Sequence, residues 1–109
     1  MAKHEFGIID TTPTTEDGFN CYEPAKYHCI SVGDRYVEPL LKELRSMQCF
    51  WHSLNRKELG LAYCGITLIP PESLEIFISA AMGKKHLEEL CVLLLKAQRE
   101  KKFVIHFGI

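Results

Sequence analysis

The chain has 109 residues, of which 47% are hydrophobic and 25% are charged, with 13 basic residues against 14 acidic ones. This length suits one domain with a single modest core, and the composition is that of a folded globular protein rather than a disordered chain. Because the formal net charge is only −1, no overall field attracts a polyanion, and we expect no nucleic-acid partner.

The N-terminal sequence MAKHEFGIID has no basic segment followed by a long apolar one. No apolar run approaches the roughly 18 residues that a membrane span requires. We therefore expect a cytoplasmic protein with no membrane partner, in which the cysteines stay reduced. All of them except the first lie in apolar runs, as buried small residues do; the five are Cys21, Cys29, Cys49, Cys64 and Cys91.

The first part of the chain predicts two strands separated by a loop. Residues 5–10 form the first strand, and residues 26–32, rich in aromatic and β-branched side chains, form the second. Residues 11–20 are polar and contain proline and glycine, which is typical of an exposed loop. This is the longest such segment in the chain.

A helix is expected next, with Asp34 as its N-terminal cap. Apolar residues recur at helical spacing from Tyr36 to Met47. Pro39 fits this helix in two ways: either the first turn is irregular, or the helix begins near Glu38 with the proline in its first turn.

A β-hairpin follows. Two strand candidates, residues 49–54 and 61–69, flank the charged stretch NRKELG, which predicts a six-residue hairpin loop. The final residues, KFVIHFGI, alternate in a way that predicts a terminal strand covered on at least one face.

The stretch GITLIPPESL takes the chain from a strand into a helix, where many enzymes bind phosphate. Pro70 and Pro71 remove two main-chain donors that such a site needs, and Glu72 places a carboxylate where the anion would lie. The stretch therefore indicates the start of a helix and not a site. Apolar spacing predicts this helix over residues 74–82 and another over residues 87–100.

Together these elements predict a single α+β domain over residues 1–109, in the order β-β-α-β-β-α-α-β. We expect a largely antiparallel sheet of four or five strands with about three helices packed on one face.

Cysteine and histidine residues suggest two kinds of site. A zinc site needs close ligand pairs such as CxxC, and the chain lacks that spacing, so we expect no metal and no cofactor. A nucleophilic thiol could instead meet a histidine once the strands assemble, which gives a small enzyme as the alternative function. The pairs that could form combine His28, His52 or His106 with Cys29, Cys49 or Cys64. Cysteines buried among apolar residues are usually inert, so we assign no catalytic residue.

The lack of catalytic motifs favours a protein–protein interaction module of an inhibitor, immunity or regulatory type, without catalytic activity. Loops held by a rigid sheet commonly form binding surfaces, so we expect another protein to contact residues 11–20 or residues 55–60. Trp51 with His52 would anchor a partner if the indole faces outward, and belongs to the core if it faces the helices. A homodimer formed through an exposed strand is a further arrangement. The candidate partner-binding residues are Thr14, Asp17, Phe19, Trp51, His52, Arg56 and Lys57.

Overall fold

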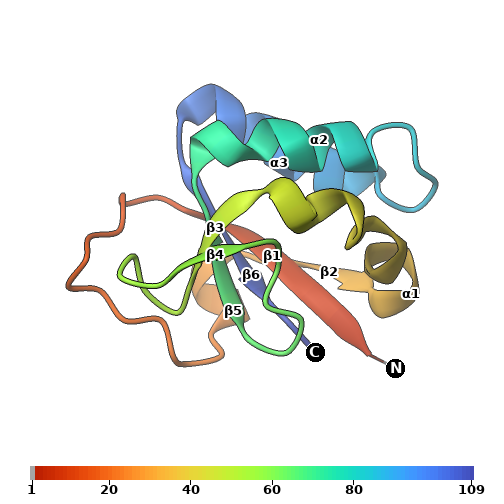
Figure 1. Ribbon diagram of the computed structural model, residues 1–109. Coiled ribbons are helices and arrows are strands. Elements are labelled where there is room, and N and C mark those ends of the chain that lie inside the picture. Colours follow the sequence, from red (N-terminus) through yellow and green to blue (C-terminus); the bar gives the residue numbers. More distant parts are fainter. Residues whose placement is uncertain (1) are drawn as a thin grey trace.

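A six-stranded antiparallel sheet forms the centre of the protein (Figure 1). The structure, a computed structural model, describes residues 2–109. The strand order is β2-β1-β6-β5-β3-β4, so the C-terminal strand lies between β1 and β5 in the middle of the sheet. The predicted α+β class is confirmed, with six strands rather than four or five. The strands are β1 (Lys3–Ile9), β2 (Ile30–Gly33), β3 (Gln48–Trp51), β4 (Lys57–Leu59), β5 (Ile66–Ile69) and β6 (Phe103–Phe107).

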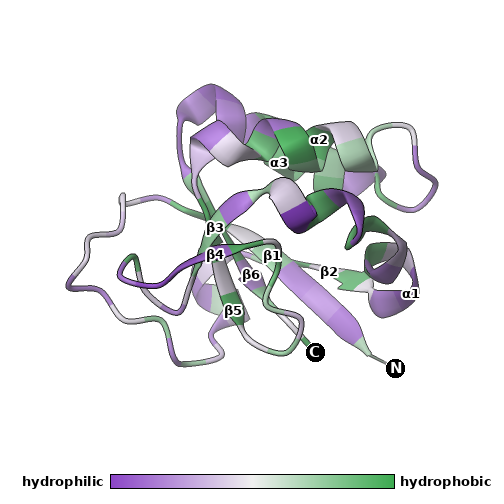
Figure 2. Ribbon diagram, viewed as in Figure 1, coloured by the Kyte–Doolittle hydropathy of each residue, from purple (hydrophilic) through white to green (hydrophobic). Residues whose placement is uncertain are grey.

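Helices cover one face of this sheet. α2 (Leu74–Ala81) and α3 (Glu88–Glu100) form the upper layer in Figure 1, and the short α1 (Asp34–Val37) directly follows β2. Figure 2 shows hydrophobic residues along the middle of this layer. The ring of Phe77 in α2 meets the ring of Phe6 in β1 edge to face at 5.6 Å between centroids, which is a favoured aromatic geometry. Within residues 2–109, no helix is long and apolar enough to cross a membrane.

The single helix predicted from Asp34 is wrong, because the chain forms three short helical turns there. They are α1, the 3-10 helix η2 (Glu38–Leu40) and the 3-10 helix η3 (Glu43–Ser46). Pro39 lies in η2, and its missing N–H breaks a continuous α-helix. Gly33, not Asp34, holds the N-cap position of α1. The apolar residues of the predicted pattern are nevertheless buried: Val37, Leu40, Leu44 and Met47.

The predicted hairpin differs in two ways. Its charged loop contains an additional strand, β4, whose residues pair with β3 in the register Gln48↔Leu59. β5 starts at Ile66 and not at residue 61, and the turn before it leaves Cys64 exposed. The expected burial of Cys64 is therefore wrong. The 3-10 helix η4 (Pro71–Ser73) then leads from β5 into α2, so the two prolines do begin a helix.

The long N-terminal loop covers the face of the sheet opposite the helices. A second, smaller core lies there, with Ile105 and Phe107 of β6 at its centre. Phe19, Tyr27 and Cys29 pack against it from the loop side. The segment 11–20 is thus mostly exposed, as expected, but it is also anchored by apolar contacts.

The second predicted strand is shorter than expected. Residues 24–27 form the 3-10 helix η1 (Pro24–Tyr27), and β2 begins only at Ile30. Between them His28 adopts a left-handed conformation with φ 51°, which turns the chain out of the sheet.

Candidate functional site

A chain of hydrogen bonds joins five polar side chains at the end of the sheet next to α1. The Tyr63 hydroxyl donates to Asp34 at 2.7 Å, and His4 Nε2 lies 2.8 Å from the other Asp34 oxygen. The second nitrogen of His4 lies 2.8 Å from His106 Nε2. His106 Nδ1 in turn lies 3.2 Å from the hydroxyl of Thr67. His4, Thr67 and His106 are completely buried.

One arrangement of donors and acceptors satisfies all the side chains in this network. An ionised Asp34 only accepts, so His4 carries a proton on Nε2 and offers Nδ1 as an acceptor. His106 Nε2–H donates to that nitrogen, and His106 Nδ1 accepts from the Thr67 hydroxyl. Thr67 accepts in turn from the Ala62 N–H at 2.8 Å. In this arrangement every ring nitrogen of His4 and His106 has a hydrogen-bond partner.

Three members of the network have pKa values shifted away from neutral pH. The hydrogen bond to Asp34 and burial raise the pKa of Tyr63 to about 12. The bonds from Tyr63 and His4 lower the pKa of Asp34. Burial lowers the pKa of His106 to about 3. Since a general acid or base works best with a pKa near the working pH, we interpret the network as a cross-link between four separate parts of the chain.

Three of the five cysteine side chains are also poorly suited to nucleophilic attack. Burial raises the pKa of Cys29 and of Cys49 to about 12, and it raises the pKa of Cys91 as well. A thiol is reactive as the thiolate, so these three groups are held in their unreactive form. Cys21 and Cys64 are exposed.

The histidines proposed as their partners make other contacts. His106 bonds to His4 and Thr67, His52 Nδ1 lies 3.0 Å from the Phe19 carbonyl oxygen, and His28 is exposed. Among residues 2–109, no cluster of three or more Cys, His, Asp or Glu side chains is placed to hold a metal ion.

The two predicted contact regions form one continuous surface. The Phe19 N–H donates to the His52 carbonyl at 2.7 Å, and the His52 ring bonds back to the Phe19 carbonyl. The Asn55 side-chain amide donates to the Thr15 carbonyl at 2.7 Å. These bonds hold the N-terminal loop against the turn between β3 and β4. We call residues 14–19 and 51–57 together the loop–hairpin surface.

The candidate residues take different positions on this surface. Thr14 and Asp17 are exposed and close a tight turn, in which the Thr14 N–H donates to the Asp17 carboxylate at 2.8 Å. Trp51 is half-buried, with its indole N–H bonded to a main-chain carbonyl, so it belongs neither wholly to the core nor to the surface. The Arg56 guanidinium lies over the indole, 5.3 Å from the ring centroid. Lys57 is exposed at the start of β4.

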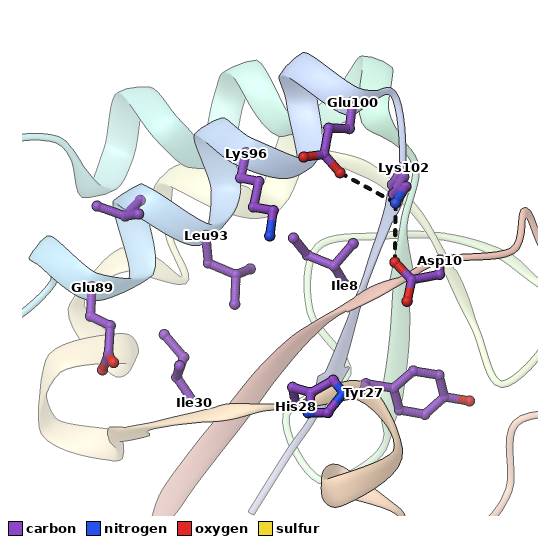
Figure 3. A pocket seen from close by; sticks show the side chains of 11 residues that line it. Ile8, Asp10, Tyr27, His28, Ile30, Glu89, Leu93, Lys96, Glu100 and Lys102 are labelled. Atoms are coloured by element: carbon purple, nitrogen blue, oxygen red, sulfur yellow. Dashed lines mark hydrogen bonds and ion pairs between the residues drawn. The ribbon is translucent and has the colours of Figure 1, made fainter.

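A groove of about 400 Å³ lies between α3 and β1 (Figure 3). The groove exists because β2 is shorter than the predicted strand 26–32. The chain turns away at His28, so β2 does not cover the end of β1. Ile8, Ile30 and Leu93 line it, with charged side chains around the opening. We call this the α3–β1 groove.

Comparisons with protein-family models, with curated proteins and with solved structures find no match to this chain. Its function therefore has to be inferred from the two surfaces and the buried network.

Sequence reasoning missed most of the buried network and the groove. It singled out His106 but not His4, although each lies two positions from an apolar residue on the same face of its strand, Val104 and Phe6 respectively. The signal that could have revealed the network is the strand face on which each histidine lies. On β1 this face carries His4 and Phe6, on β6 it carries Val104 and His106, and both faces point toward the helices. The pairing of the two strands, which sets the histidines side by side, is not readable from either strand alone.

Proposed function

We propose that the chain is a protein-binding module without catalytic activity, of an inhibitor, immunity or regulatory type, and that another protein binds its loop–hairpin surface. The observation that carries this proposal is the set of hydrogen bonds between the loop and the hairpin. They order the loop before a partner arrives, so less conformational entropy is lost on binding.

The side chains on this surface support the proposal. Tryptophan and arginine are enriched among the residues that contribute most to binding, and here Arg56 stacks on Trp51 near the centre of the surface. Asp17 and Lys57 provide exposed charges of both signs around them. Leu59, on the edge strand β4, is 60% exposed and extends the surface with an apolar side chain. A surface of this kind combines an aromatic centre with a polar rim.

The alternative, an enzyme with a Cys/His pair, has less support. The thiols of Cys29 and Cys49 have raised pKa values, and the buried histidines bond to each other instead of to sulfur. A binding role uses the exposed parts of the chain and requires nothing of these groups.

Photo-cross-linking in a lysate of the source cells tests the proposal. A photoreactive amino acid replaces Lys57 on the loop–hairpin surface in one sample and Ser79, exposed on α2, in a matched control. We expect one discrete adduct with another protein from the Lys57 position and none from the Ser79 position. An adduct from Ser79 alone, or no adduct from either position, would contradict the proposal.

A further inference from the structure

The α3–β1 groove has an aliphatic floor that faces solvent. Ile8 from β1, Ile30 from β2 and Leu93 from α3 are each only partly buried, so their side chains remain accessible. Figure 3 shows Leu93 and Ile8 directed toward each other across the groove, with Ile30 farther along it. A second apolar group placed here would remove all three side chains from water.

Within residues 2–109, no strand pairs with β1 at this point on its β2 side. β1 pairs with β2 only as far as Phe6↔Ile30. The Asp34 N–H donates to the Ala2 carbonyl, which places the even-numbered residues of β1 with their main-chain groups toward β2. By the alternation of an antiparallel strand, the N–H and C=O of Ile8 point the same way, beyond the end of β2. The floor of the groove therefore offers a main-chain donor and acceptor.

The groove carries charges of both signs, and Lys96 is the cation that a ligand can reach beside Ile8. Lys102 bonds to Asp10 at 3.0 Å and to Glu100 at 3.2 Å, so these three side chains neutralise one another in part. Lys96 makes no ion pair within the described residues 2–109, and Figure 3 shows its ammonium directed into the groove above Ile8. Lys96 is thus the positive charge available to a ligand, while Glu89, which also lines the groove, would repel a second acidic group.

We propose that the α3–β1 groove binds an extended peptide segment of another protein, which adds to the free edge of β1 as a short strand. Its main chain bonds to the N–H and C=O of Ile8, and one aliphatic side chain packs on the aliphatic floor. An acidic side chain next to it pairs with Lys96. Main-chain pairing supplies affinity and the side-chain contacts supply selectivity, as in other cases of strand addition. This site is separate from the loop–hairpin surface.

Selection from a phage-displayed library of random heptapeptides tests this inference. Panning is carried out on the wild-type chain and on Leu93→Gln, with Leu95→Gln as the matched control. Both leucines lie on α3 and are partly exposed, but only Leu93 lines the groove. We expect enriched peptides to carry an aliphatic residue beside an acidic one, and to bind Leu93→Gln at least about tenfold more weakly than wild type or Leu95→Gln.

A second pair of variants does not depend on the packing of Leu93. Lys96→Gln, compared with Arg99→Gln on the same helix, should weaken binding of the acidic peptides by a few fold and leave their neutral counterparts unchanged. N-methylation of the main-chain amides at alternate residues of the peptide tests the strand pairing. Methylation of the amides that face β1 should abolish binding, and methylation of the amides that face away should not.

Three results would overturn the inference. They are peptides that bind all variants equally, peptides that tolerate both methylation patterns, and a doubled mass in light scattering that Leu93→Gln abolishes, which would place a second copy of the chain in the groove. An Arg56→Ala variant separates this site from the proposed function. This variant should leave the affinity for the peptides unchanged. The groove proposal and the loop–hairpin proposal can therefore be contradicted independently of each other.

Discussion

At the scale of single residues, the buried His106 makes stability depend on pH. Burial lowers the pKa of His106 to about 3, against 6.5 for a free histidine, so between these values the unfolded chain binds a proton that the folded chain does not. The free energy of unfolding should therefore fall as the pH drops from about 6.5 toward 3, by up to about 1.4 kcal/mol per pH unit for this one proton. Urea denaturation at several pH values measures this slope.

Two variants test whether His106 causes this dependence of the free energy of unfolding on pH. His106→Gln should lower the free energy of unfolding at neutral pH by about 1–3 kcal/mol, because His4 loses a buried partner, and should make the slope shallower. His28→Asn changes an exposed histidine with a left-handed backbone, which asparagine tolerates, and should keep the wild-type slope. An unchanged slope in His106→Gln would show that the acid sensitivity arises elsewhere.

The cysteines should differ in their rates of alkylation. Cys21 and Cys64 are exposed and should react with iodoacetamide in the native protein, whereas Cys29, Cys49 and Cys91 should react only when the structure opens locally. Burial raises the pKa of each of these three thiols, which slows them further. Peptide mapping by mass spectrometry gives the five rates. If Cys29, Cys49 or Cys91 reacted fastest, the enzyme hypothesis would regain support.

At the scale of elements, the sequence predicts burial better than conformation. The apolar residues from Val37 to Met47 recur every three or four positions, a spacing that a series of 3-10 turns satisfies nearly as well as an α-helix. The pattern therefore identified the side that faces the core, while Pro39 determined that no continuous helix forms. α2 and α3 lack an interior proline, and both were predicted within a few residues of their ends.

The sequence-based prediction was least accurate for the short strands at the edges of the sheet. β4 has three residues, of which two are charged, and it becomes a strand only because β3 lies beside it. β2 is shorter than the predicted strand 26–32 because the chain turns out of the sheet at His28. Tyr27 and Cys29 therefore pack on the face of the sheet opposite the helices. Strand propensity reflects a residue's surroundings, which a local sequence pattern does not contain.

At the scale of the whole molecule, the segment between β1 and β2 shapes both proposed binding sites. It leaves the helix-covered face at Asp10, which opens the α3–β1 groove, and then passes under the sheet to form the second core. This segment also bonds to the hairpin. The two bonded pairs are separated by 33 and by 40 positions in the sequence. Five of the seven candidate residues were chosen because they lie in predicted loops, and Trp51 with His52 because tryptophan often anchors binding partners. That those two loops form one surface follows from the sheet order and was not predictable from local pattern.

The most direct test of the central claim is hydrogen exchange of the N-terminal loop, measured by NMR for each amide. The claim is that the loop is ordered on the hairpin before any partner binds, through the Phe19 N–H and the Asn55 amide. We predict that the Phe19 amide exchanges at least roughly tenfold more slowly than that of its neighbour Gly18. Asn55→Ala should remove much of this protection, whereas Asn20→Ala, at an exposed position in the same loop, should not. A Phe19 amide that exchanges as fast as an unstructured peptide would contradict a preformed loop–hairpin surface.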